Sequence, residues 1–203
     1  MQVETQASYT AFAGQTRVAS GTLKQVAAAA KKALDAGEWT PLLIFNDATS
    51  EPVEMDFRGT AKEVLKRIST APAAGAPAPE TPRGPGRPKL GVVAREVTLL
   101  PRHWDWLGTQ PGGASVALRK LVEEARRVNR GKDRKRRAQE VAYRFMSAIA
   151  GNLPDFEDAA RALFAGDKER FEAILKRWPG DVRDHAATLA ADAFDGSTGV
   201  GRQ

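Results

Sequence analysis

The side chains with the clearest chemical potential in this sequence are arginines and lysines crowded into its middle third. Residues 71–137 contain 15 Lys and Arg against 6 Asp and Glu, whereas residues 1–70 are neutral and residues 138–203 are slightly acidic. A basic segment between neutral and acidic flanks is typical of a localised surface for polyanions, most often nucleic acid. A solvated charged face without a partner is the alternative.

Other kinds of chemistry have few residues to support them. The chain has no cysteine and only two histidines, His103 and His185, which excludes disulfides, thiolate nucleophiles, Cys-ligated metals and His-rich metal sites. No phosphate-cradling Gly motif is present. We therefore expect a protein that is not an enzyme and binds no cofactor or metal, with His185 packed in a helical core.

No basic region followed by an apolar run opens the chain, and no 18 apolar residues occur in succession. These features predict a cytoplasmic protein with neither a signal peptide nor a membrane partner.

Composition and periodicity predict an α+β protein divided by a proline-rich linker. The expected parts are a small α+β domain (1–70), a Pro/Gly-rich basic linker (71–89), a strand-helix-helix module (90–130), a helical C-terminal region (131–195) and a disordered tail (196–203).

The α+β domain is expected to follow the order ββαββα. A hairpin turns at Gly14 and Gln15, and the alternation of Val53, Met55 and Phe57 predicts the last strand. In the C-terminal region, one helix is expected over residues 134–150, and three short ones begin at Pro154, Asp167 and Asp181.

The basic centre has a pattern of its own. Residues 90–128 read as a short strand, a helix that begins at Pro101, a Gly-rich turn and a second helix. Trp104 and Trp106, two residues apart, cannot share a helical face, so one of them is expected in the core. In the second helix an apolar stripe requires a partner; its members are Ala114, Leu118, Leu121, Val122, Ala125 and Val128.

Residues 97–101 (VTLLP), Trp104 and Leu107, and residues 113–122 (GASVALRKLV) resemble the ribbon-helix-helix DNA-binding fold of the Arc, methionine-repressor and plasmid copy-control repressors. This resemblance implies a homodimer whose paired strands enter the major groove of double-stranded DNA. It also implies that Gly113 and Ser115, at the second helix N-terminus, anchor phosphates. The connection between Leu107 and Ser115 is shorter than is usual in that family, and Pro111 breaks the first helix early.

The strand register leaves two alternatives for the side chains that face bases. If Val97 and Leu99 face the core, Glu96 and Thr98 point to the bases, whereas the other parity directs Arg95 and Val97 there. Arg95 suits guanine and Thr98 suits a thymine methyl group, so both are candidate base contacts.

Further basic residues flank this module. Arg83, Arg87 and Lys89 lie in a stretch partly similar to the AT-hook, and they form either a minor-groove arm or a charged tether. Residues 126–137 are dense in Arg and Lys, which is typical of phosphate contacts. The candidate phosphate contacts on the helix are Arg119, Lys120, Arg126, Arg127, Arg130 and Arg134.

The chain as a whole resembles bacterial domain of unknown function family 2239, through residues 9–14, 43–49 and 87–107. That resemblance carries no activity with it. The residues favour a dimeric DNA-binding protein, a transcriptional regulator or nucleoid-type binder. The alternative is a module whose flanking domains bind a protein or small ligand and whose residues 90–128 only dimerise it.

Overall fold

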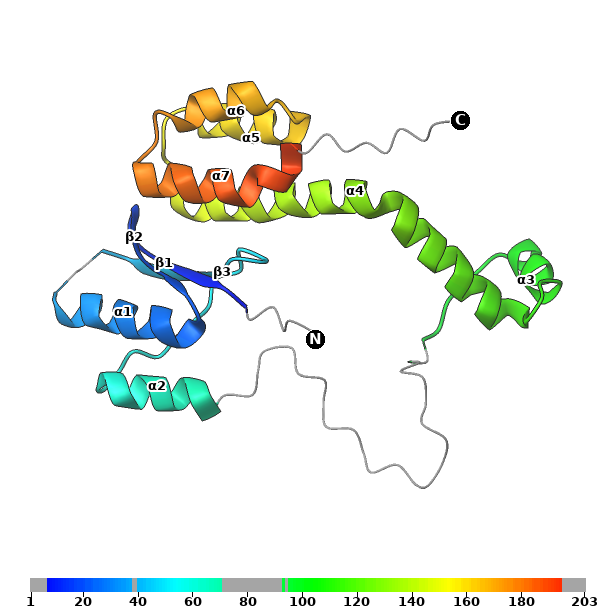
Figure 1. The fold of residues 1–203 in the computed structure, drawn as a ribbon, viewed down its shortest axis with the longest axis horizontal. Helices are drawn as coiled ribbons and strands as arrows, with labels where there is room; N and C mark the ends of the chain where they lie inside the picture. Colours follow the sequence, from blue (N-terminus) through cyan, green and yellow to red (C-terminus); the bar gives the residue numbers. More distant parts are fainter. Residues whose placement is uncertain (1–6, 38–39, 71–92, 94, 195–203) are drawn as a thin grey trace. The chain divides into compact units, whose positions relative to one another are not determined.

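The computed structural model describes residues 7–37, 40–70, 93 and 95–194. The fold is mixed α+β, as expected: an N-terminal three-stranded antiparallel sheet and a larger helical part (Figure 1). The chain divides into two compact units, one formed by residues 1–71 with 131–203 and the other by residues 72–130.

In the described part of the chain, no helix is both long enough and apolar enough to cross a lipid bilayer.

The sheet has the order β2-β1-β3, in which β1 (Tyr9–Ala13) is central, β2 (Thr16–Gly21) lies on one side and β3 (Leu42–Asn46) on the other. Both pairings are antiparallel. The expected hairpin turn is confirmed at Gly14, whose φ of 58° is a conformation that glycine adopts without strain. Because β1 is central, the outer side of β3 is one of the two edges of the sheet.

One face of the sheet is covered by α1 (Leu23–Asp35), with α2 (Ala61–Thr70) following β3. Thr22 begins α1 with a capping box, in which its hydroxyl oxygen accepts from the Gln25 backbone N–H and the Gln25 side chain accepts from the Thr22 N–H. Val26 and Ala30 of α1 pack against Ala11 and Ile44 of the sheet.

The strand expected at residues 53–57 is not formed, so the order is ββαβα. Pairing with β3 ends after one bridge between Phe45 and Pro52, in which the Val53 N–H donates to the Ile44 carbonyl at 2.7 Å. The side chains of this segment are instead half-buried against the hydrophobic cluster between α1 and the sheet, which we call the α1 cluster. They are Val53, Met55 and Phe57. Their alternation is thus satisfied by side-chain packing without a hydrogen-bonded ladder.

The opposite face of the sheet packs on helices from the C-terminal part of the chain: α4 (Gly113–Ile149), α5 (Phe156–Ala165), α6 (Lys168–Leu175) and α7 (Gly180–Phe194). The Phe145 ring lies 5.2 Å from that of Phe12 and 5.4 Å from that of Phe45. His185 is buried against the same rings, as expected for a core histidine. Residues from both ends of the chain therefore share one hydrophobic core.

The helix starts agree with the sequence at one of three positions. Asp167 caps α6 by accepting from the Arg170 N–H at 3.0 Å. By contrast, α5 begins after Asp155, which has a left-handed φ of 60°, and not at Pro154. Asp181 lies within α7 and accepts from the Arg17 N–H at 2.8 Å, so its carboxylate joins the helix to β2 and does not cap it.

The basic centre contains α3 (Pro101–Gly108) and the first part of α4. Two separate helices were expected, one over the apolar stripe and another from Arg134, but α4 is a single helix of 37 residues. Gly131 is its only helix-weakening residue at the junction, and a lone glycine costs about 1 kcal/mol without breaking a helix of good helix formers.

Candidate nucleic-acid interface

The expected strand is not formed in the single chain. Val93 and residues 95–100 belong to no strand, and Leu100 has an extended backbone with φ −67° and ψ 149°. A strand needs a partner for its ladder hydrogen bonds, and no other described segment pairs with this one. All four candidate side chains are exposed: Arg95, Glu96, Val97 and Thr98. In the single chain, therefore, neither set of alternating side chains is buried in a core.

The expectation of one core tryptophan in α3 is wrong for the single chain. Trp104 is 43% exposed and Trp106 is 50% exposed, and Leu107 is the buried side chain of this helix. A helix of this length has a buried face only where another element covers it. Both indole rings therefore remain available for contacts outside the chain.

The apolar stripe of α4 is largely uncovered. Leu121, Val122 and Val128 are 49%, 54% and 64% exposed. Among described residues of the second unit, only Leu107 and Ala117 are buried hydrophobic side chains. Two such side chains are far too few to stabilise an independent unit, so this stripe needs a partner surface.

A basic face runs along α4 on the side away from that stripe. Arg119, Arg126 and Arg130 follow one another at spacings of seven and four residues, which places them on one side of a helix. All three are exposed. We refer to these three residues as the basic face of α4.

Six of the expected phosphate contacts lie on α4. Arg119, Arg126 and Arg130 share the basic face, and by the same periodicity Lys120 and Arg127 lie on the adjoining side of the helix. Arg134 belongs to the other compact unit. The helix therefore brings three of the expected residues together on one face.

Some of these cations have partners within the helix. Arg126 Nη1 lies 2.9 Å from Glu123 Oε1, and Arg127 Nη2 lies 2.7 Å from Glu124 Oε1. The hydrogen bond from Arg127 lowers the pKa of the Glu124 carboxyl and raises that of the guanidinium. Because such exposed pairs are weak and screened by solvent, a stronger anion can replace the glutamate. In the described residues, Lys120 and Arg130 have no ion pair.

Two glycines with left-handed backbones lie where α4 begins: Gly112, just before the helix, has a φ of 85°, and Gly113, its first residue, has a φ of 74°. A Cβ atom on Gly112 would lie 3.1 Å from Cβ of Val116, a tight contact, and the left-handed backbone would be strained by any side chain. Ser115 is exposed, and the first turn holds no acidic residue. The positive end of the helix dipole is thus free of a competing carboxylate.

The expected minor-groove arm, with Arg83, Arg87 and Lys89, lies outside the described residues, as do most of the linker and the tail.

A second polar group, not expected from the sequence, lies between the sheet and the C-terminal helices. Asp47 Oδ1, Ser50 Oγ and His185 Nε2 are buried and have no hydrogen-bond partner in the described chain. Ser50 also has a left-handed φ of 51°. Asp47 and Ser50 belong to one loop, whereas His185 is far away in the sequence. Because only tertiary packing brings His185 to within 3.8 Å of Asp47, no local signal could have revealed this pair.

No group of three or more His, Asp or Glu side chains in the described part is arranged to hold a metal ion.

The model of a bacterial family described as "Uncharacterized protein conserved in bacteria (DUF2239)" matches residues 8–190. The match covers most of the chain, which belongs to this family. A search of curated proteins and a search of solved structures each found no match.

Proposed function

We propose that this member of the DUF2239 family is a homodimeric DNA-binding protein whose basic centre forms both the dimer and the DNA surface. The observation that carries the proposal is the two-sided character of α4. An exposed apolar stripe lies on one side and the basic face on the other. The first side requires a protein partner, and the second suits a polyanion.

A second copy of the chain would supply both a neighbouring strand for the segment before α3 and a cover for the apolar stripe of α4. Val93 and residues 95–99 lack a neighbouring strand in the described chain, and an antiparallel copy related by a two-fold axis would supply one. The same axis would bring the Leu121 and Val122 surfaces of the two chains together. The ribbon-helix-helix resemblance of residues 97–122 supports this arrangement.

In such a dimer, the paired strands would face the major groove, with Arg95 or Thr98 directed to base edges according to the register. The N-terminus of α4, with Gly113 and Ser115, would hold a phosphate. The basic face would add phosphate contacts that position the protein without reading sequence. Transcriptional regulation is the function that this combination of base and phosphate contacts supports best.

The deciding experiment measures binding of the full chain to labelled duplex DNA by fluorescence anisotropy at about 50 and 200 mM salt. We expect affinity that falls steeply with salt, because each phosphate contact releases counterions. The double variant Arg126→Gln/Arg130→Gln is expected to weaken binding to all sequences and to reduce the salt slope by about two.

The matched control is Lys24→Gln/Lys176→Gln, which removes two exposed charges from the other compact unit. Equal weakening by both double variants would show only a net-charge effect and would contradict a DNA surface on α4. Absence of binding at low salt would contradict the proposal as a whole.

A further inference from the structure

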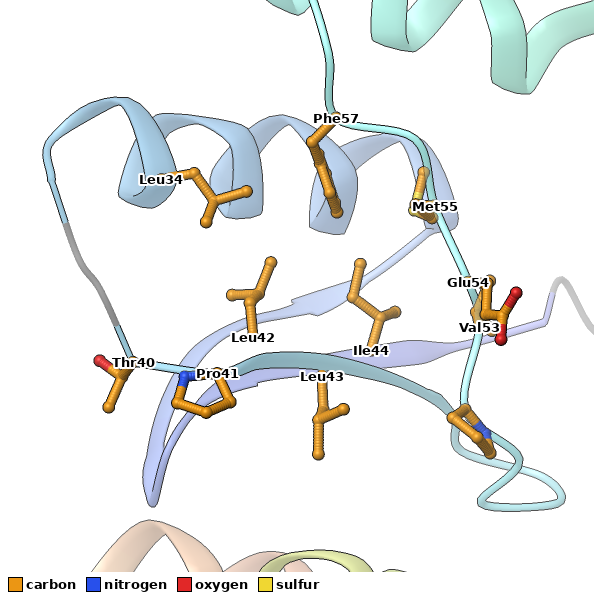
Figure 2. Close-up of a pocket in the computed structure, with 11 residues that line it drawn as sticks. Leu34, Thr40, Pro41, Leu42, Leu43, Ile44, Val53, Glu54, Met55 and Phe57 are labelled. Atoms are coloured by element: carbon orange, nitrogen blue, oxygen red, sulfur yellow. The ribbon is translucent and has the colours of Figure 1, made fainter.

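A groove in the N-terminal part of the chain lies beside the free edge of β3 (Figure 2). Its volume is about 870 Å³, within the range of ligand-binding sites. It is lined mainly by apolar side chains from α1, β3 and the segment after Pro52. The principal ones are Leu34, Leu42, Ile44, Val53, Met55 and Phe57.

The backbone of β3 carries unused hydrogen-bonding groups toward this groove. The Gly14 N–H donates to the Pro41 carbonyl, so residue 41 faces β1, and with the alternation of an antiparallel pair residues 43 and 45 do as well. Residues 42, 44 and 46 face the other way, because Ile44 accepts from Val53 and Asn46 donates to Glu51.

Three of the backbone groups that point away from β1 have no hydrogen-bond partner in the described chain. They are the Leu42 N–H, the Leu42 carbonyl and the Ile44 N–H. The chain after Val53 turns away from β3 and leaves the place of a fourth strand open. An unpaired donor on Ile44, a residue only 3% exposed, is costly unless another strand reaches it.

The side chains beside this edge match an added strand. Leu42 and Ile44 point toward α1, where Leu34 points back at them and Phe57 and Met55 lie on the same side (Figure 2). Leu43 points to the opposite side of the sheet. Because successive side chains of a strand alternate between faces, an added strand would place every second side chain against this apolar surface.

The groove also has a charge preference. Glu54 is the only charged side chain that lines it. It is exposed, and it has no hydrogen bond or ion pair in the described chain. Nearby Asp56, by contrast, is already paired with Arg58. A ligand with a positive charge beside its apolar residues is therefore complementary to this groove.

We propose that the free edge of β3 binds an extended peptide segment of another protein, with apolar side chains at alternate positions and a Lys or Arg opposite Glu54. The peptide would add as a strand through the main-chain groups of Leu42 and Ile44. This interaction is independent of DNA binding by the basic centre.

The test uses the full chain and a fluorescent, acetylated and amidated peptide with valine at alternate positions and one terminal lysine. We expect saturable binding in fluorescence anisotropy. N-methylation of the peptide amides that face β3 should weaken binding about tenfold, because it removes main-chain donors. Equal binding of the N-methylated peptide, or no binding of either, would overturn the proposal.

Charge reversal tests the role of Glu54. Glu54→Lys should shift the preference from the lysine peptide to one with glutamate at that position, whereas the control Asp192→Lys on α7 should not. An unchanged preference in Glu54→Lys would contradict the assigned peptide chemistry.

Amide hydrogen exchange locates the peptide. Bound peptide should slow exchange at Leu42 and Ile44 and leave Leu43 unchanged, because the Leu43 N–H already faces β1. Protection confined to other elements would place the peptide elsewhere and overturn the proposal.

Discussion

Nε2 of His185 on α7 lies 3.8 Å from Oδ1 of Asp47, in the loop after β3, and both atoms are buried without a hydrogen bond in the described chain. Burial lowers the pKa of His185, and Arg17 acts in the same direction, while the Asp47 carboxylate opposes them. Arg17 is itself held at the same boundary by its backbone bond to Asp181. The neutral histidine is thus the form that the folded protein favours.

This pair predicts that acid weakens the contact between the sheet and the helices. An unfolded histidine takes up its proton near pH 6.5, whereas the folded one resists it to lower pH. The unfolded state therefore binds more protons in this window, and the free energy of unfolding should fall as the pH decreases below about 6.5. Urea unfolding at a series of pH values measures this pH dependence of the free energy of unfolding. His185→Gln should flatten this dependence, while His103→Gln, at an exposed histidine, should not; an unchanged slope in His185→Gln would contradict the assignment.

Gln139 on α4 is expected to stabilise the end of α5. Its buried Nε2 donates to the Leu163 carbonyl at 2.9 Å and to the Phe164 carbonyl at 3.2 Å. Carbonyls in the last turn of a helix have few partners within the helix. Gln139→Ala should lower the free energy of unfolding by about 1–2 kcal/mol, and Gln139→Glu by more, because it sets an acceptor against two carbonyls. Chemical denaturation measures both. The exposed neighbour Glu140→Gln serves as the control, and equal effects at the two positions would contradict this capping role.

Phe145 should be essential for the shared core. This α4 side chain is fully buried, and its ring contacts those of Phe12, Phe45 and His185. Phe145→Ala is expected to cost about 3–5 kcal/mol, because it leaves a cavity between the sheet and the helices. Phe164→Ala is the control, since Phe164 is 51% exposed. Thermal unfolding followed by circular dichroism would contradict the shared core if the two variants melted at the same temperature.

The apolar stripe of α4 predicts dimerisation. Leu121→Glu would place a charge in the surface that a second copy would cover in the proposed dimer, and we expect it to convert a dimer into a monomer in light scattering. Ser147→Glu adds the same charge at an exposed position of the same helix and should leave the dimer intact. A monomeric parent protein at micromolar concentration would refute the prediction directly.

The strand pairing proposed for that dimer has its own test. Val97→Pro removes a main-chain donor, so it should abolish both the dimer and DNA binding, whereas Val97→Thr keeps the donor and the β-branched shape and should preserve both. Light scattering and DNA anisotropy on the two variants provide the measurement. Retention of a dimer by Val97→Pro would leave the helices as its sole interface and remove the support for a paired ribbon.

The sequence by itself determined the local elements. The turn at Gly14, the helix that begins at Pro101, the cap at Asp167 and the apolar and basic sides of α4 all follow from residue type and spacing, because neighbours along the chain decide them. The concentration of positive charge between residues 71 and 137 is likewise a property of the sequence alone.

Only the tertiary structure decided which of those elements meet. The alternating residues 53–57 predicted a strand, yet their side chains reach the α1 cluster without a ladder, and this leaves the edge of β3 open. The Asp47, Ser50 and His185 group and the core around Phe145 join residues far apart in the chain. Contacts of this kind depend on the packing of whole elements in space, and local periodicity carries no information about which faces come together.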